Sequence, residues 1–173
     1  ERFDPEFRKK IKWDIPLLDG YRFKFLKNYS LKPTSGSVFG EVNPSIIREI
    51  YREKYDAVLI YGWYHVTSWL AFLAAFLTRT PVFLRSENPL LKELDKSALK
   101  IKVKKVVLGW LFRRVAAFLY IGEENKKFYE YYGAEPGKLI FCLYAVDNQR
   151  FTKASREEAA HRRFYRKELG IRD

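Results

Sequence analysis

Two short apolar runs enclose a longer one in the middle of the chain. Residues 57–61 read AVLIY, a run rich in β-branched and aromatic side chains that is typical of a buried strand, and Gly62 interrupts it. Residues 66–77 are apolar over the length of a helix, and Pro81 ends this segment before a second short run at residues 82–84. The pattern predicts a strand, a helix and a second strand, which together form the βαβ unit of a parallel sheet.

Residues 57–78 contain no charged side chain, which raises a second interpretation of this stretch. They are about as long as a membrane span of roughly 20 residues. A spanning helix would place the glycine break at Gly62 and the imidazole of His65 deep in the bilayer without a partner. The folded βαβ unit is therefore the favoured interpretation.

Segments before this unit continue the alternation of strand and helix patterns. Residues 21–26 alternate aromatic and basic side chains with a period of two, which predicts a half-buried strand toward the edge of the sheet. Asn43 and Pro44 suit the start of a helix. The apolar face of that helix would hold Ile46, Ile47, Ile50 and Tyr51.

The second half of the chain contains further segments of the same kinds. Residues 117–121 and 138–143 are short apolar runs that predict strands, and residues 123–132 predict a helix between them. Acidic residues in the first turn of that helix interact favourably with the helix dipole and so stabilise the helix. Ser155 and Glu158 form a capping box, which predicts a polar helix that starts there.

Residues 97–115 predict a helix with two apolar faces. One face holds Leu99, Val103, Val106 and Trp110, and the other holds Ile101, Leu108, Phe112 and Val115. One apolar face is enough to pack on a sheet, whereas a second face edged by long cationic side chains suits a helix in a membrane interface. The membrane-surface cations would be Lys100, Lys104, Lys105, Arg113 and Arg114. A helix buried on both sides, or one packed on another domain, explains the pattern equally well.

Composition limits the class of protein and the chemistry of its partners. The 173 residues suffice for one α/β domain, and a hydrophobic fraction of 47% supports a folded core. The net charge of +12 requires a basic face, whose partner would be nucleic acid, anionic lipid or a phosphorylated substrate. Cys142 is the only cysteine, which excludes an internal disulfide and a metal site built from several cysteines.

Polar and aromatic residues directly follow both strands of the βαβ unit. Trp63, Tyr64 and His65 come after the first strand, and Arg85 and Glu87 come after the second. Ligands of open parallel sheets bind beyond the carboxyl ends of the strands, so these five residues form the candidate site. Two structural roles stay open: the histidine could be satisfied by backbone or solvent at a helix start, and the arginine could pair with the glutamate.

The order of the elements, with a loop reading YAVDNQRF and a charged helix ending in ELGIRD, resembles the family four glycosyltransferases, which are retaining enzymes of the GT-B fold. Val146, Asp147 and Phe151 match the turn that this family places after a strand, whereas Ala145 stands where the family usually has glycine. The segments IKWDIPLLDGY, FLRSE and LFRRVAAFLYIGEENKKFY also resemble bacterial members that act in cell-wall or surface-polysaccharide synthesis.

The resemblance implies an α/β fold: a Rossmann-like parallel sheet with helices on both faces, forming the N-terminal half of a GT-B enzyme. Residues 1–151 would be the acceptor-side domain without its first strand and glycine-rich loop. Residues 152–173 would be a hinge and a charged helix leading to a nucleotide-sugar-binding domain. The chain has no methionine and its first ten residues do not resemble a signal peptide, so we expect it to be part of a longer protein.

The resemblance also implies a function and roles for single residues. The whole protein would transfer a sugar, of the hexosyl type, from a nucleotide-sugar to a glycan or lipid-linked acceptor at the inner face of the cell membrane. His65 would be catalytic, and Asp147 would hold the hinge. The acceptor-binding residues would be Trp63, Tyr64, Arg85, Glu87 and Asp14. Asp14 could equally be a turn acid beside Pro16.

This domain would itself bind no cofactor and no metal, because the nucleotide-sugar belongs to the second domain, and alone it should be inactive. A basic nucleic-acid-binding module, or another Rossmann-like binding module without enzymatic activity, is the alternative function. The chain contains no recognisable nucleic-acid-binding signature, so no nucleic acid is expected as a partner. It also lacks a G-x-G-x-x-G motif and a P-loop, which disfavours a free-standing nucleotide-binding protein.

Overall fold

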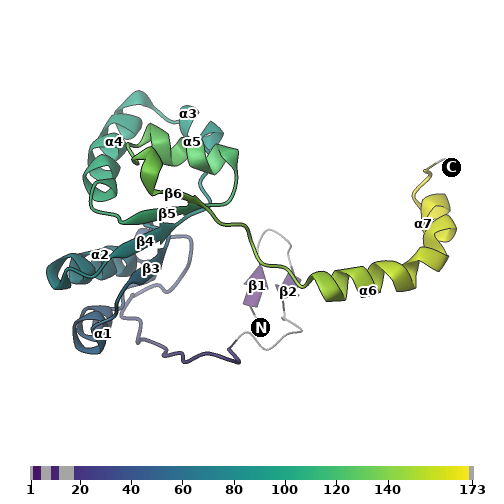
Figure 1. The fold of residues 1–173 in the computed structure, drawn as a ribbon, viewed down its shortest axis with the longest axis horizontal. Coiled ribbons are helices and arrows are strands. Elements are labelled where there is room, and N and C mark those ends of the chain that lie inside the picture. The colour runs from purple at the N-terminus through teal and green to yellow at the C-terminus, as the bar shows by residue number, and fades with distance from the viewer. Residues whose placement is uncertain (1, 5–8, 12–17, 172–173) are drawn as a thin grey trace. The chain divides into compact units, whose positions relative to one another are not determined.

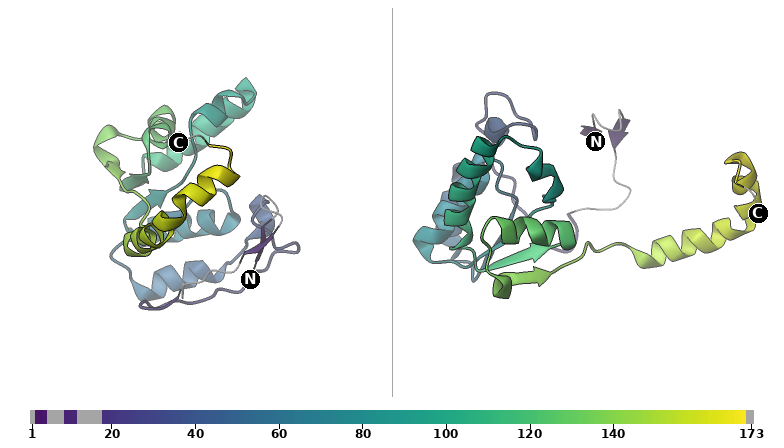
Figure 2. Two further views of the ribbon diagram at one scale, coloured as in Figure 1. Left: turned by 90° about the vertical axis from the view of Figure 1, so that its right-hand side faces the viewer. Right: turned by 90° about the horizontal axis from the view of Figure 1, so that it is seen from above.

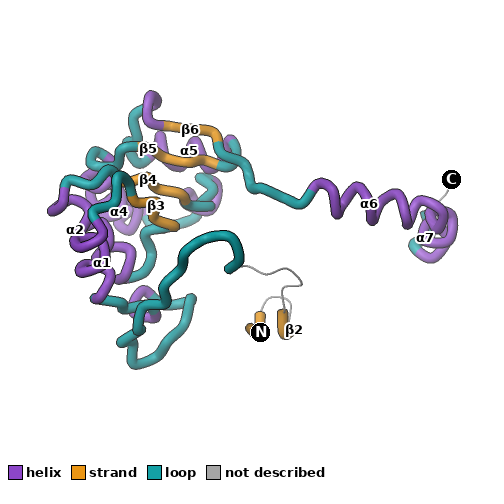
Figure 3. The backbone as a smooth tube through the Cα atoms, turned by 60° about the horizontal axis from the view of Figure 1, so that its bottom comes forward, coloured by secondary structure: helices purple, strands orange, loops and turns teal. Residues whose placement is uncertain are grey.

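A computed structural model describes residues 2–4, 9–11 and 18–171 of the chain (Figure 1). The chain divides into two compact units, Glu1–Val82 and Phe83–Asp173, which are described separately. Strands β3 to β6 hydrogen-bond in the order β3-β4-β5-β6, and the pairs β4–β5 and β5–β6 run parallel (Figure 3). The α/β class and the Rossmann-like parallel sheet are therefore confirmed.

The first unit contains most of the predicted βαβ motif. Its elements are β1 (Arg2–Asp4), β2 (Lys9–Ile11), the 3-10 turn η1 (Val38–Gly40), α1 (Ser45–Glu53), β3 (Val58–Tyr61) and α2 (Val66–Thr78). Strands β1 and β2 form a small antiparallel pair. Helices α1 and α2 pack together, and Ile50 of α1 and Phe72 and Ala75 of α2 are fully buried. Burial of such side chains contributes about 1.5–3 kcal/mol for each large one.

The predicted strand at residues 21–26 is wrong, because this segment is irregular. Its alternating aromatic side chains are exposed, and Phe25 reaches 80% exposure. Side-chain bonds attach the segment to the region of α1 instead: Lys24 pairs with Glu49, and the Asn43 amide donates to the carbonyl of Leu26. The alternating pattern therefore did not produce a strand here, because no other layer of the structure covers the aromatic side chains of this segment.

The second unit contains the rest of the sheet and the remaining helices. Its elements are β4 (Val82–Arg85), α3 (Leu91–Leu94), α4 (Ala98–Phe112), β5 (Ala117–Tyr120), α5 (Glu123–Tyr131), the 3-10 turn η2 (Pro136–Lys138), β6 (Leu139–Phe141), α6 (Asn148–Glu158), the 3-10 turn η3 (Ala159–His161) and α7 (Arg162–Glu168). Figure 2 shows α5 lying along the strands β5 and β6. The rings of Phe112, Phe118 and Tyr129 meet between these elements, with centroids 4.8 to 5.8 Å apart.

The last predicted helix starts earlier than its capping box suggested. Helix α6 begins at Asn148, so Ser155 lies inside the helix and does not cap it. The cap is Asp147, whose carboxylate accepts a hydrogen bond from the backbone amide of Arg150 at 3.0 Å. No residue of α6 is buried. Of the helices that the structure describes, none has both the length and the apolar character needed to cross a bilayer.

Candidate functional site

The first group of candidate residues follows β3 in the first unit. Gly62 has φ of +75°, a left-handed conformation that suits glycine, and it turns the chain sharply away from the strand. Trp63, Tyr64 and His65 then connect the strand to α2, which begins at Val66. The ring of Tyr64 meets the ring of His65 edge to face, with centroids 5.1 Å apart. The structure thus brings these three predicted residues together at the carboxyl end of β3.

His65 has a defined hydrogen-bonding arrangement. Its Nδ1 lies 3.0 Å from the carbonyl oxygen of Ser37. A carbonyl oxygen only accepts, so Nδ1 carries the proton, and Nε2 of the neutral ring presents a lone pair. The Glu41 carboxylate lies 3.8 Å from Nε2, and the His65 side chain is 19% exposed. The imidazole therefore has one nitrogen held by backbone and one nitrogen able to accept a proton.

The loop of residues 28–43 holds Ser37 and Glu41 beside the imidazole. The Asn28 side chain closes the loop at its base: its Oδ1 accepts from the backbone amide of Val42 at 2.9 Å, and its Nδ2 donates to the carbonyl of Gly40 at 2.9 Å. Thr67, in the first turn of α2, donates to the carbonyl of Glu41 from both its amide and its hydroxyl. The loop is thus bonded to the helix that carries the histidine.

Ser37 and Glu41 were not among the candidate residues identified from the sequence. A weak signal was present, because asparagine side chains often bond the backbone two residues further on. Asn28 makes such a bond to the amide of Ser30. Gly40 is a second signal, because a Cβ atom there would lie 1.8 Å from the carbonyl oxygen of Thr34. Only glycine fits where these two parts of the loop meet.

The second group of candidate residues lies in the second unit, at the carboxyl ends of β4 and β6. Arg85 ends β4 and is 8% exposed. Its guanidinium donates to the Cys142 sulfur at 3.2 Å and lies over the ring of Tyr144, 4.7 Å from the centroid. The Tyr144 hydroxyl in turn donates to the carboxylate of Glu87. The structure therefore brings Arg85 and Glu87 together through Tyr144.

Cys142 and Tyr144 were not identified as site residues from the sequence. Both lie in the loop after β6, so the rule that pointed to the residues after β3 and β4 would also have found them. The contacts bridge 57 residues of sequence, from Arg85 to Cys142 and from Glu87 to Tyr144. No local pattern indicates a pairing at that distance.

Buried hydrogen bonds fix the backbone around the second group. The hydroxyls of Ser86 and Tyr129 lie 3.0 Å apart and are both buried. Burial raises the pKa of Tyr129, against the opposing hydrogen bond with Ser86, so the phenol stays neutral. The Asn125 amide donates to the carbonyl of Asn88 at 3.1 Å. Helix α5 thereby holds the segment that follows β4.

The cations predicted to contact a membrane do not share one environment. Lys104 is mostly buried, and its ammonium contacts the carboxylate of Glu93 at 2.6 Å. Lys105 lies 4.4 Å above the ring of Tyr131 on α5. The others predicted for this role are exposed: Lys100, Arg113 and Arg114. Lys104 thus has a structural role, which the spacing of charges along the helix did not reveal.

Asp147 and Asp14 are the two remaining residues predicted for the site and the hinge. Asp147 bonds a backbone amide, as expected for a residue that shapes the chain, although its role as a hinge stays a prediction. Asp14 lies outside the described residues. The predicted domain boundary at residues 151–152 falls within α6 and also stays a prediction.

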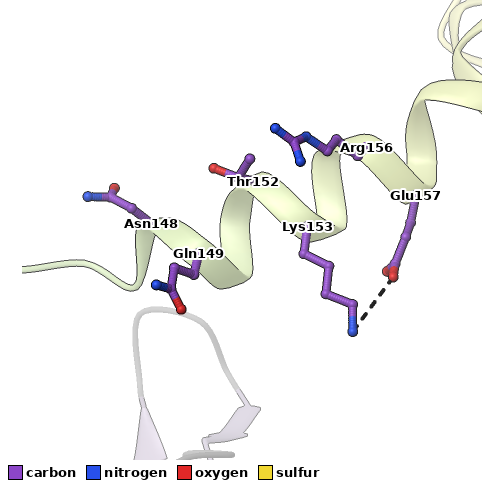
Figure 4. A pocket seen from close by; sticks show the side chains of 6 residues that line it. All are labelled: Asn148, Gln149, Thr152, Lys153, Arg156 and Glu157. Carbon is purple, nitrogen blue, oxygen red and sulfur yellow. Dashed lines mark ion pairs between the residues drawn. The ribbon is translucent and has the colours of Figure 1, made fainter.

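A hollow of about 550 Å³ lies along α6 (Figure 4). Its lining consists of Asn148, Gln149, Thr152, Lys153, Arg156 and Glu157. All of them are exposed and come from a single helix, so the hollow is an open surface and not an enclosed site. Within the described part of the chain, no group of three or more His, Cys, Asp and Glu residues is placed to hold a metal ion.

Comparison of the chain with protein-family models, with curated proteins and with solved structures finds no match. The resemblance to glycosyltransferases therefore stays a prediction from the sequence.

Proposed function

We propose that this chain is the acceptor-side domain of a retaining glycosyltransferase. The whole protein would transfer a hexosyl group from a nucleotide-sugar to a glycan or lipid-linked acceptor, and would lie peripherally on the cytoplasmic face of a membrane. The donor would bind to a second Rossmann-like domain after Asp173. Support comes from the sequence resemblance and from the polar residues at the carboxyl ends of β3, β4 and β6, where parallel sheets bind ligands.

The arrangement of His65 is the observation that carries the proposal. With Nδ1 donating to Ser37, Nε2 can accept a hydrogen bond from an acceptor hydroxyl and orient its oxygen for attack. Glu41, 3.8 Å from Nε2, would stabilise the imidazolium if the proton moves to the ring. Retaining transfer of this kind depends on positioning and on electrostatic stabilisation of the leaving group, so one orienting imidazole is an adequate contribution from this domain.

The second group supplies complementary chemistry. The Arg85 guanidinium is a fixed cation suited to an anionic group of the acceptor, such as a phosphate. Glu87 is exposed and already accepts one hydroxyl, that of Tyr144, which an acceptor hydroxyl can replace or join. The flat Tyr144 ring beside these charges offers a surface on which a sugar can stack.

The test is a transfer assay on the full natural protein with a panel of nucleotide-sugars and acceptors, in which NMR reads the anomeric configuration of the product. His65→Asn is the informative variant, because the asparagine amide can keep the hydrogen bond to Ser37 while Nε2 is lost. We expect kcat/KM to fall by roughly 10²–10⁴-fold, the range for a positioned acid–base group. His161→Asn, in the exposed η3, is the matched control and should leave kcat/KM unchanged.

Three results would refute the proposal. One is that the protein neither transfers the sugar of any nucleotide-sugar nor hydrolyses it slowly. Another is an inverted product, which contradicts the retaining mechanism. The third is full activity of His65→Asn in an otherwise active enzyme, which would remove His65 from the chemistry.

A further inference from the structure

Helix α4 has one buried side and one exposed apolar side. Leu108, Leu111 and Phe112 are at most 1% exposed and pack into the second unit. On the opposite side lie four apolar residues spaced by four, three and four positions, so they form one stripe along the helix. This outer stripe consists of Leu99 (73% exposed), Val103 (56%), Val106 (69%) and Trp110 (44%). The structure thus excludes a helix buried on both sides within this unit.

Cations border the outer stripe on both sides. At 100° per residue, Lys100 lies on one flank and Lys102 lies on the other. Arg113 and Arg114 follow the end of the helix directly, and all four cations are exposed. The Arg114 guanidinium stacks on the ring of Trp110 at 4.0 Å. Lys100, Lys102, Arg113 and Arg114 are the rim cations of this surface. Residues 96–122 contain no Asp or Glu, so the helix itself carries no acid that could neutralise them.

An anionic bilayer fits this combination of features. Long cationic side chains can bury their stems and keep their charges at the headgroups, while aliphatic side chains enter the acyl boundary. Tryptophan is enriched at that depth. Two copies of the chain joined through the stripe would bring the rim cations of both together without an acid on either α4 to pair them. A nucleic acid would satisfy the cations but would leave Leu99, Val103 and Val106 without an apolar partner.

We propose that the outer stripe and the rim cations of α4 form a docking surface for an anionic membrane. The helix lies in the plane of the interface, with the stripe in the acyl boundary and the rim cations among lipid phosphates. This inference rests on the proposed function in one respect only, namely that docking would bring the enzyme close to a lipid-linked acceptor. Its test contains no sugar, so failure of docking and failure of transfer are separate results.

The experiment measures partition of the full chain into vesicles of phosphatidylcholine with about 30% phosphatidylglycerol, by co-sedimentation and by the emission of Trp110. Trp110→Phe identifies which part of the emission change belongs to that residue. Lys100→Gln with Lys102→Gln should lower partition by about 30-fold, since one cation near an anionic surface changes it by about five-fold. Lys153→Gln with Lys167→Gln removes the same charge from exposed positions on α6 and α7, and should change partition far less.

The apolar contribution needs its own pair of variants. Val103→Ser with Val106→Ser should lower partition by about ten-fold or more, because less apolar surface enters the bilayer. Leu73→Ser with Leu77→Ser alters two exposed residues of α2 and serves as the control. All four sites are exposed, and circular dichroism confirms that each variant is folded.

The possible outcomes decide between docking and its alternatives. Loss of partition in both α4 variants, with retention in both controls, supports the proposal. Equal loss in the rim and control charge variants overturns it, because binding would then follow net charge alone. Concentration-dependent dimerisation abolished by the valine variant overturns it in favour of a second copy. Binding to duplex DNA or RNA in preference to vesicles, unaffected by the valine variant, overturns it in favour of nucleic acid.

Discussion

The buried carboxylate of Glu93 allows a direct test of the contacts that hold α4 in the second unit. Its carboxylate is 3% exposed and receives three hydrogen bonds, from Lys96 at 2.5 Å, from Lys104 at 2.6 Å and from Tyr132 at 2.7 Å. One side chain of α3 thereby fastens α4 and the end of α5. Glu93→Gln keeps the shape but removes the charge, so the largely buried ammonium of Lys104 loses its counter-ion.

The expected magnitude follows from burial of the partners. Removing one partner of a buried ion pair costs about 3–5 kcal/mol, because the remaining charge is uncompensated. The Lys104 side chain is 15% exposed, whereas Lys96 is 43% exposed and can turn to water, so only the first contact counts in full. We therefore expect a loss of about 3 kcal/mol in the free energy of unfolding. With a urea dependence of about 2 kcal/mol per molar, the midpoint should fall by about 1.5 M.

The stability that Glu93 contributes should depend on pH in a direction set by the shift of its pKa. Burial alone would raise the pKa of Glu93, but the hydrogen bonds from Lys104, Lys96 and Tyr132 outweigh it and lower the pKa below its ordinary 4.5. A group whose pKa is lower in the folded state stabilises the fold above its ordinary pKa and loses this effect as pH falls through the folded value. The difference between wild type and Glu93→Gln should therefore be complete at pH 7 and shrink toward pH 3.

The assay is urea unfolding followed by circular dichroism at both pH values, with Glu124→Gln as control. Glu124 pairs with Lys127 on the exposed surface of α5, and such pairs contribute little, so its midpoint should barely change. Similar midpoints of the two variants at pH 7 would contradict the role of Glu93 as the counter-ion of Lys104. An equal effect of Glu93→Gln at both pH values would also contradict it, because the loss would then come from packing and not from charge.

Two further predictions concern the backbone around the candidate site. Gly40→Ala should displace the loop that holds Ser37 beside His65, because the new Cβ would overlap the carbonyl of Thr34, whereas Gly137→Ala has open space and serves as control. Two-dimensional NMR of the imidazole should show a changed Nδ1 signal only in the first variant, and an unchanged signal would contradict the role given to the loop. Asp147→Ala should speed amide hydrogen exchange in the first turn of α6 by roughly five-fold through loss of its cap, and equal rates would show that Asp147 is not needed there.

The sequence allowed the central βαβ unit to be predicted closely. Residues 57–61, 66–77 and 82–84 correspond to β3, α2 and β4 within one residue at either end. Each of these elements carries its own signal: a run of β-branched residues, a long apolar segment, and a glycine or proline at its boundary. Such signals are local, so a single sequence is enough to read them.

The failed predictions share a physical cause. The alternation at residues 21–26 describes an amphipathic strand, but a strand also needs a neighbour, and the sequence does not say whether one is present. Ser155 and Glu158 match a capping box, but the same spacing occurs inside α6, where Asp147 had already started the helix. In both cases the local pattern was present, but the surrounding structure did not produce the element that the pattern predicted.

The candidate site was predictable only in part for the same reason. The residues after β3 and β4 were found, since position after a strand is visible in the chain. Their partners were not, because His65 meets Ser37 across 28 residues and Glu87 meets Tyr144 across 57. Those contacts fix the tautomer of His65 and the direction of both side chains. The sequence therefore indicates which positions can hold functional residues, and the structure is needed to show which of their atoms face a ligand.

Helix α4 shows how far charge alone can mislead. Six cations lie between residues 100 and 114, and the sequence predicted the same membrane-surface role for five of them, all but Lys102. In the structure Lys104 neutralises Glu93 and Lys105 lies over Tyr131, which leaves four at the rim of the outer stripe. Lys104 therefore stabilises the packing of α4, and the rim cations are available to a partner. A variant that neutralised all six would confuse loss of folding with loss of docking, so separating these two sets is the condition for testing either.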